Sequence, residues 1–205
     1  MSEQERLFAI TAYERALWET GTSLVAGIDE VGRGPLVGPV VTACVIMPWE
    51  PLVEGVKDSK KLTEKRREAL YDRIREEAVC WSIGMASAAE IDRINILNAT
   101  KLAMLRAVEG MAVQPEHLLV DALQLDTAIP CTAIVKGDAL SYSIGAASIL
   151  AKVTRDRMMR ELDERYPLYG FAKHKGYGTK EHREALLRYG PIPEHRQSFI
   201  RKIAG

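Results

Sequence analysis

The stretch GIDEVGRGPLVGPVVTACVI, Gly27 to Ile46, carries the main structural signals of this chain. An apolar run from Leu24 to Ile28 predicts a buried strand, and a run rich in valine and isoleucine from Val37 to Met47 predicts a second. Between them, Gly32-Arg33-Gly34-Pro35 is a turn signal that favours an antiparallel connection. The charged pair Asp29-Glu30 directly follows the first run. This stretch therefore predicts two paired strands with carboxylates where the first one ends.

The pattern of apolar residues predicts further strands and helices after this pair. Three more runs are strand candidates: Val79 to Ala86, Leu118 to Val120 and Cys131 to Val135. Helices are expected from a cap at Thr63 to about Ala78, from a capping box at Ser87 to about Met111 with a break near Asn95, over 141–165, and in a short segment that ends near Gly190. Together these elements predict an α/β fold, a mixed sheet with helices on both faces.

The N-terminus predicts a helix of its own. Residues 3–19 place apolar side chains at helical spacing after Ser2, a candidate N-cap. We expect this helix over 1–20, as the remnant of a longer N-terminal region, and a main domain over 21–205 that ends in a helical segment. A length of 205 residues suits one domain with a small appendage.

The composition is that of an ordinary globular protein, with 47% hydrophobic and 27% charged residues. Basic and acidic residues balance at 28 each, so net charge alone does not indicate a polyanionic partner. The longest apolar stretch, Leu36 to Pro48, is too short to span a bilayer, and no signal peptide is visible. The three cysteines are widely spaced without a CxxC, which favours free thiols over zinc or a disulfide. We expect a cytoplasmic protein with no membrane partner.

Acidic residues follow three of the predicted strands. Asp121 comes after the Leu118 to Val120 run, and Asp138 follows shortly after the run that ends at Val135. If the strands are neighbours, Asp29-Glu30, Asp121 and Asp138 converge, and clustered carboxylates suit a hard divalent cation such as magnesium. Two such ions about 4 Å apart can activate a water molecule and stabilise the leaving oxygen in phosphodiester hydrolysis. Acidic residues are also common where a strand simply ends at the solvent. Their spacing alone therefore leaves open whether these carboxylates bind metal or are only exposed strand ends.

Several motifs, taken together, resemble the type 2 ribonucleases H, specifically the bacterial ribonuclease HII family. Besides Gly27 to Ile46, the similar blocks are KDSKKL (Lys57 to Leu62), LVDAL (Leu119 to Leu123), KGD (Lys136 to Asp138), AASILAKVTRD (Ala146 to Asp156), HKGYGT (His174 to Thr179) and HRQSF (His195 to Phe199). They occur in the family's order and cover about residues 24–200. So many separated blocks make the resemblance highly specific.

The resemblance implies a fold, a metal site and a reaction. The fold would be the ribonuclease H-like mixed five-stranded sheet flanked by helices. The family's metal-binding carboxylates match Asp29, Glu30, Asp121 and Asp138, which would hold two Mg²⁺ or Mn²⁺ ions with the substrate. The family hydrolyses the RNA strand of RNA–DNA hybrids and nicks duplex DNA 5′ to an embedded ribonucleotide, leaving 3′-hydroxyl and 5′-phosphate ends. The implied roles are ribonucleotide removal and RNA primer processing, by a monomer with no obligate protein partner.

The resemblance also assigns residues that read the sugar. Gly32, Arg33 and Gly34 match the element that contacts the ribose at the RNA–DNA junction, and Tyr177 matches the tyrosine that packs on the next deoxyribose. Glycines allow close backbone approach, and a 2′-hydroxyl both donates and accepts hydrogen bonds. Without the resemblance, a plain turn that needs positive φ and an ordinary surface or core-edge tyrosine are the favoured interpretations.

Other candidate substrate contacts are basic or polar. Lys57, Lys60 and Lys61 flank Ser59, and the match favours a phosphate contact for Lys60 above all, although a charge run is usually just a solvated face. His174 and Lys175 form a second basic cluster with Lys173, beside Tyr177. Ser148, Lys152 and Asp156 share one helix face. Ser148 and Lys152 are candidate contacts, and Asp156 is an ion-pair partner or a support for the metal ligands, not itself a ligand.

Two other hypotheses fit parts of the pattern. A junction resolvase or type 1 ribonuclease H would also use clustered carboxylates, but the Gly32-Arg33-Gly34 turn and Tyr177 argue against it. A non-catalytic module that binds RNA–DNA hybrids would be expected to lack at least one carboxylate, and all four are present.

Overall fold

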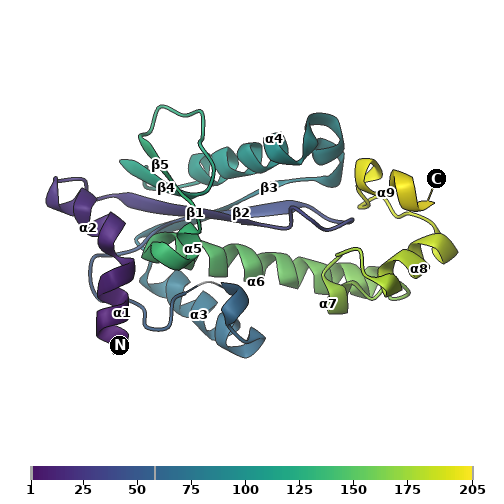
Figure 1. The fold of residues 1–205 in the computed structure, drawn as a ribbon, viewed down its shortest axis with the longest axis horizontal. Helices are drawn as coiled ribbons and strands as arrows, with labels where there is room; N and C mark the ends of the chain where they lie inside the picture. The colour runs from purple at the N-terminus through teal and green to yellow at the C-terminus, as the bar shows by residue number, and fades with distance from the viewer. Residues whose placement is uncertain (1, 58, 205) are drawn as a thin grey trace.

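A computed structural model of the chain describes residues 2–57 and 59–204. Its centre is one five-stranded sheet with the strand order β3-β2-β1-β4-β5 (Figure 1). The strands are β1 (Val25–Val31), β2 (Val40–Ile46), β3 (Cys80–Ala86), β4 (His117–Asp121) and β5 (Cys131–Ile134). The first three form an antiparallel meander, and β4 and β5 continue from β1 in parallel. The predicted mixed five-stranded sheet and the antiparallel β1–β2 connection are confirmed.

Helices cover both faces of this sheet (Figure 1). The long helix α6 (Tyr142–Arg165) packs on one face with α3 (Glu64–Glu77) beside it, and α4 (Ala88–Glu109) covers the other face. The contact is close on both sides: a Cβ at Gly27 in β1 would lie 2.1 Å from the Ser143 carbonyl carbon, and one at Gly84 in β3 would lie 2.0 Å from the Ala103 oxygen. Glycine at these two positions lets the helices approach the sheet.

The N-terminal segment forms two helices where the sequence predicts one. They are α1 (Glu3–Ile10) and α2 (Ala12–Glu19), and the Thr11 hydroxyl between them donates to the Leu7 and Phe8 carbonyls. Such back-bonding bends a helix. The predicted N-cap at Ser2 is confirmed, and Ser2 forms a capping box with Glu5. The buried Glu14 carboxylate accepts hydrogen bonds from the Ser141 hydroxyl and the Ser143 amide at the start of α6, so this segment packs onto the main domain.

The remaining elements are short. They are a 3₁₀ turn at Ser59–Lys61, α5 (Gly137–Leu140), α7 (Phe171–His174), α8 (Lys180–Tyr189) and α9 (Gln197–Ala204). Of these, α7, α8 and α9 gather at the end of the molecule away from α1 and α2 (Figure 1). The predicted break in α4 is confirmed, because Asn95 has φ 67°. A bridge between Val37 and His195 ties the C-terminal segment to the chain that follows the Gly32-Arg33-Gly34 turn.

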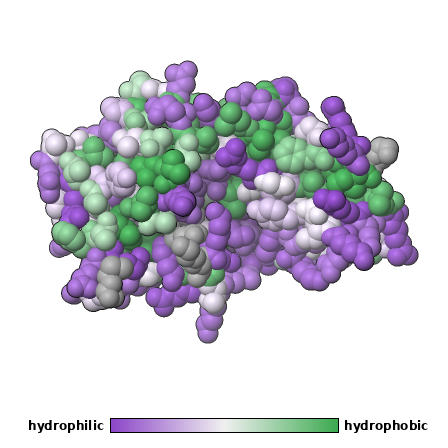
Figure 2. Space-filling model, viewed as in Figure 1, coloured by the Kyte–Doolittle hydropathy of each residue, from purple (hydrophilic) through white to green (hydrophobic). Residues whose placement is uncertain are grey.

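The surface in Figure 2 is mostly polar, with apolar side chains gathered near the two ends of the molecule. Phe8 and Trp49 are among the exposed apolar residues. Within the described ranges, no helix has the length and apolar character needed to cross a membrane. Cys44, Cys80 and Cys131 are free thiols, as predicted.

Candidate active site

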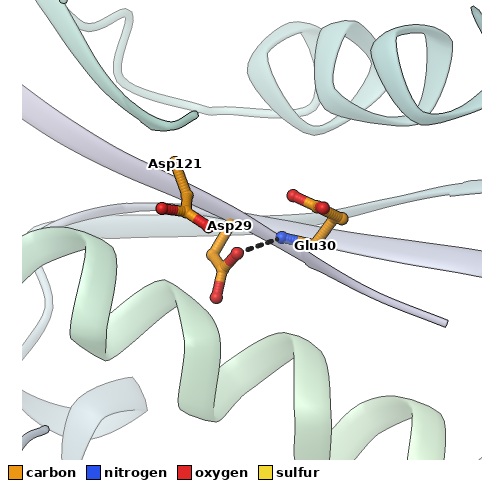
Figure 3. A group of neighbouring side chains, drawn as sticks. All are labelled: Asp29, Glu30 and Asp121. Atoms are coloured by element: carbon orange, nitrogen blue, oxygen red, sulfur yellow. Dashed lines mark hydrogen bonds between the residues drawn. The ribbon is translucent and has the colours of Figure 1, made fainter. Parts of the chain in front are cut away.

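Three carboxylates meet beside the centre of the sheet (Figure 3). Asp29 and Glu30 come from β1 and Asp121 is the last residue of β4, and each offers an oxygen within 4.8 Å of the other two. Parallel pairing sets Ile28 beside Val120, so Asp29 and Asp121 are the next residues on neighbouring strands. Asp29 and Glu30 lie within β1, not after it as predicted. The neighbouring strand β4 ends at Asp121, whereas β1 continues to Val31.

The electrostatics of this cluster favour a cation. Asp29 is only 5% exposed, and burial together with the neighbouring Glu30 and Asp121 raises its pKa well above the ordinary value, against a hydrogen bond from Ser148. Burial also raises the pKa of Glu30, although the Arg33 guanidinium opposes the shift. In the part of the chain that the structure describes, Glu30 Oε2 is buried without a hydrogen-bond partner. Crowded carboxylates and an unsatisfied oxygen fit a hard divalent ion.

Asp138 lies next to this cluster but outside it. Among the described residues, the group whose oxygens meet within 4.8 Å contains Asp29, Glu30 and Asp121 alone. Asp138 sits in α5, with its carboxylate 3.9 Å from Lys60 Nζ. The preceding residue makes the direct contact, because the Gly137 amide donates a 2.7 Å hydrogen bond to Asp121 Oδ1. Lys136 adopts the left-handed conformation, with φ 60°, at the start of this turn.

Ser148 supports the cluster from α6. It is buried, hydrogen-bonds to Asp29, and its hydroxyl lies 2.8 Å from that of Ser59. One and two turns further along α6, Lys152 donates a 2.7 Å hydrogen bond to Asp156, whose other oxygen lies 4.0 Å from Arg67. Asp156 is therefore an ion-pair partner, the first of its two predicted roles. Lys152 is occupied by that pair.

The Gly32-Arg33-Gly34 turn is held by two fully buried arginines. Arg196 donates to the carbonyls of Gly32, Arg33 and Gly38 at 2.6, 2.9 and 3.0 Å. Arg155 lies against Gly32, which has φ +91°, so that a Cβ there would stand 2.3 Å from Arg155 Nε. The arginine forks satisfy backbone carbonyls that no regular strand pairs. Sequence reasoning missed both residues, although they lie in the AASILAKVTRD and HRQSF blocks.

Tyr177 lies beside this turn, as its predicted role requires. Tyr177 is 45% exposed, and a Cβ at Gly34 would stand 3.4 Å from its Cε1 atom. The Leu36 amide donates a 2.8 Å hydrogen bond to the Gly176 carbonyl, which joins the two segments. The aromatic ring therefore lies next to a turn that has no side chain at Gly34.

The two basic clusters differ in what they expose. The Lys60 side chain is 79% exposed, near Asp138, while Asp58 and the Lys61 side chain lie outside the described residues. His174 is buried: Nε2 lies 2.8 Å from the Tyr169 carbonyl and Nδ1 accepts from the Gly176 amide. Its ring supports the loop from inside and does not face outward as a predicted substrate contact would. Lys175 is half-buried, and its carbonyl accepts from Arg155.

A mixed sheet with a carboxylate cluster that fits a divalent ion, beside an exposed basic side chain, defines a metal-dependent nuclease of the ribonuclease H kind. The sequence model of the family Ribonuclease HII matches residues 26–202. The chain is 58% identical over 197 residues to Ribonuclease HII of Bacillus cytotoxicus. The aligned region covers 96% of this chain and 76% of that protein. The chain belongs to the ribonuclease HII family.

Solved structures agree with this assignment. The ribonuclease H2 of Pyrococcus horikoshii OT3 superposes with a TM-score of 0.73 at 29% identity, over 88% of this chain and 96% of that one. A structure of the PCNA:RNase HII complex from Archaeoglobus fulgidus gives 0.70 at 28% identity, over 85% and 93%. The protein is a divalent-metal-dependent endoribonuclease that hydrolyses RNA in RNA–DNA hybrids.

Proposed function

We propose that this enzyme also nicks duplex DNA on the 5′ side of an embedded ribonucleotide, and that it leaves 3′-hydroxyl and 5′-phosphate ends. The observation that carries the proposal is the position of the carboxylate cluster immediately before a turn and a tyrosine suited to read a sugar. Glu30 and Arg33 form the link, with Arg33 Nη1 3.4 Å from Glu30 Oε1. Cutting and sugar discrimination would thus occur at neighbouring residues.

Asp29, Glu30, Asp121 and Asp138 would hold the divalent ions. Two bound ions supply an activated water and stabilise the leaving oxygen in phosphodiester hydrolysis. In the chain itself, Ser148 and the Glu30 amide orient the Asp29 carboxylate, and the Gly137 amide orients Asp121. Both magnesium and manganese prefer oxygen ligands of this kind. We propose magnesium or manganese as the natural ion.

The backbone of Gly32, Arg33 and Gly34 would contact the ribose. A 2′-hydroxyl donates and accepts hydrogen bonds, so peptide groups discriminate it from a 2′-hydrogen without any side chain. Tyr177 would pack on the following deoxyribose, where an added hydroxyl would crowd the ring. Arg196 donates hydrogen bonds to the carbonyls of Gly32 and Arg33. Because these bonds fix the backbone of the turn, it would present a rigid surface to the sugar.

The duplex would be positioned by contacts that do not read its sequence. Lys60 and Lys175 are the candidates for phosphate contacts. Ser148, Lys152 and His174 would act mainly by positioning the residues to which they hydrogen-bond. Such contacts make binding salt-dependent. We propose that the enzyme acts as a monomer without an obligate protein partner, in ribonucleotide removal and RNA primer processing.

The test uses the purified protein and labelled substrates of matched sequence. These are a DNA duplex with one ribonucleotide, the all-DNA duplex, and an all-DNA four-way junction, each with magnesium, manganese or EDTA. We expect a metal-dependent nick in the first substrate only. Cleavage of the junction in preference to the ribonucleotide duplex would favour a resolvase, and binding of the duplex without any cleavage would favour a non-catalytic module.

The matched variants are Asp121→Asn and Asp126→Asn, which change a cluster carboxylate and an exposed aspartate on the following loop. The first should abolish cleavage while duplex binding persists, and the second should leave both unchanged. Wild-type turnover in Asp121→Asn would overturn the proposal.

A further inference from the structure

Three buried histidines lie in and beside the loop that carries Tyr177, and the proposed function gives no role to two of them, His182 and His195. His174, His182 and His195 are 8%, 0% and 1% exposed and pack against Phe171. His174 stacks on His182, with ring centroids 4.6 Å apart. A buried imidazole needs partners for both ring nitrogens, so the direction of its hydrogen bonds is informative.

The bonds of His182 and His195 have one consistent direction. The Ile192 amide donates to His195 Nδ1 at 2.9 Å, so the proton of a neutral His195 is on Nε2. That nitrogen lies 3.1 Å from His182 Nε2, which must accept. The proton of His182 is then on Nδ1, which donates to the Tyr177 carbonyl at 2.9 Å. The two rings form a relay that runs from Ile192 to the backbone of Tyr177.

The two histidines are joined to the two parts of the proposed sugar-reading surface, which are Tyr177 and the Gly32-Arg33-Gly34 turn. His182 is in the first turn of α8, where the Thr179 hydroxyl caps its amide. His195 pairs with Val37, and the next residue, Arg196, holds the Gly32-Arg33-Gly34 turn. The relay therefore connects the segment beneath Tyr177 with the segment beneath the turn. Burial lowers the pKa of both histidines, that of His195 to about 4, which keeps both rings neutral.

We propose that His182 and His195 are positioning residues for Tyr177, which fix its backbone so that the exposed ring stays over Gly34. The proposal rests on the proposed function, since it assigns the purpose of this placement to junction recognition. Tyr177 is 45% exposed, and Gly34 beside its ring offers no side chain to hold it. Its location depends on the backbone, and a misplacement of about 1 Å can cost a hundredfold in rate.

The first test compares His182→Leu with His182→Asn. Leucine has a similar size but no donor, whereas the asparagine amide can replace Nδ1 as the donor to the Tyr177 carbonyl. The readout is kcat/KM for a DNA duplex with one ribonucleotide divided by kcat/KM for a hybrid with a continuous RNA strand. We expect this ratio to fall about tenfold in the leucine variant and to return to within about threefold of wild type in the asparagine variant.

The matched control is His117→Leu, because His117 is partly buried on β4 and pairs with Thr132, away from Tyr177. It should leave the ratio unchanged. An unchanged ratio in a folded His182→Leu variant, or an equal fall in His182→Asn and His182→Leu, would overturn the proposal.

The second test does not depend on catalysis or on a destabilised variant. Nitrogen-15 NMR of the wild-type protein reports the tautomer of each histidine. We expect neutral His182 with its proton on Nδ1 and neutral His195 with its proton on Nε2 at pH 7. The opposite tautomer at either ring would refute the relay. If the tautomers are as expected but the wild type cuts no ribonucleotide duplex, the relay stands and the proposed function fails.

Discussion

Arg196 Nη2 donates a 2.6 Å hydrogen bond to the carbonyl of Gly32, a residue 164 positions earlier in the chain. This contact joins the C-terminal segment to the turn that follows the carboxylate pair. The same guanidinium also bonds to the Arg33 and Gly38 carbonyls, so one buried side chain fixes the path of the chain from β1 toward β2. The turn that we propose to read the sugar is therefore completed only when the C-terminal segment has packed.

Replacing Arg196 with lysine should destabilise the protein. A single ammonium on a flexible stem cannot reach three carbonyls that a planar fork holds, and buried carbonyls would lose their partners. We expect a loss of about 3 kcal/mol in the free energy of unfolding, measured by urea denaturation. Arg188→Lys, at an exposed position on α8, should change stability by no more than about 0.5 kcal/mol. Equal midpoints for the two variants would contradict this role for Arg196.

Asp29→Asn should stabilise the metal-free protein while it abolishes cleavage. Burial and the neighbouring Glu30 and Asp121 raise the pKa of Asp29 in the native state above its unfolded value. The native state therefore loses stability as pH rises through the native pKa, and the ionised form is costly at neutral pH. We expect the variant to gain about 1 kcal/mol in EDTA at pH 7, and the difference to shrink in acid.

The effect of magnesium on the melting temperature gives a second test of the role of Asp29. An ion that binds only the native state raises the melting temperature. We expect magnesium to raise that of the wild type and of the Asp126→Asn control more than that of Asp29→Asn. An Asp29→Asn variant that is less stable than wild type in EDTA would show that the carboxylates are not under electrostatic strain.

Gly27→Ala should disrupt the contact between β1 and α6. The added Cβ would lie 2.1 Å from the Ser143 carbonyl carbon and 2.4 Å from the Ile144 amide nitrogen, which are both backbone atoms. We expect a loss of at least about 3 kcal/mol by urea denaturation. Gly21→Ala is the control, because nothing lies within 4 Å and only its φ of +92° opposes a side chain, at a cost of about 1 kcal/mol. A well-folded Gly27→Ala variant would mean that α6 packs less closely than described.

Lys60→Ala should weaken substrate binding without changing the fold. The side chain is 79% exposed and near Asp138, so its removal costs little stability. If it contacts one phosphate, the slope of log affinity against log salt should become shallower by about 0.9. Fluorescence anisotropy with a labelled duplex in calcium or EDTA would measure this slope. Lys101→Ala, on α4 at the opposite face of the sheet, should leave it unchanged.

Most of the framework follows from local patterns in the sequence. Continuous runs of apolar residues predicted the five strands, and the Ser87 capping box and the Thr63 cap predicted two of the main helices, because each signal depends on residues close together in the chain. The antiparallel β1–β2 connection followed from the Gly32-Arg33-Gly34-Pro35 signal. The break at Thr11 escaped prediction, since apolar spacing continues through it and only the threonine side chain bends the helix.

The site was predictable only in part, because its assembly depends on long-range contacts. A carboxylate that follows an apolar run is visible in the sequence, and three of the four predicted carboxylates meet. The buried roles of Arg155 and Arg196 are not visible, since charged residues usually lie on the surface and their carbonyl partners lie far away in sequence. His174 reads as part of a basic cluster, yet its ring faces inward because the loop turns back on itself.

We propose that this enzyme selects the bond it cuts by the 2′-hydroxyl next to its carboxylate cluster. The most direct measurement is to map the nick, at nucleotide resolution, in a DNA duplex with one ribonucleotide in magnesium. We expect a single nick on the 5′ side of that ribonucleotide, with a 3′-hydroxyl end. The nick should disappear when the ribonucleotide carries hydrogen in place of its 2′-hydroxyl, in EDTA, and in Asp121→Asn. A nick that persists at the same position in the all-DNA duplex would contradict this proposal.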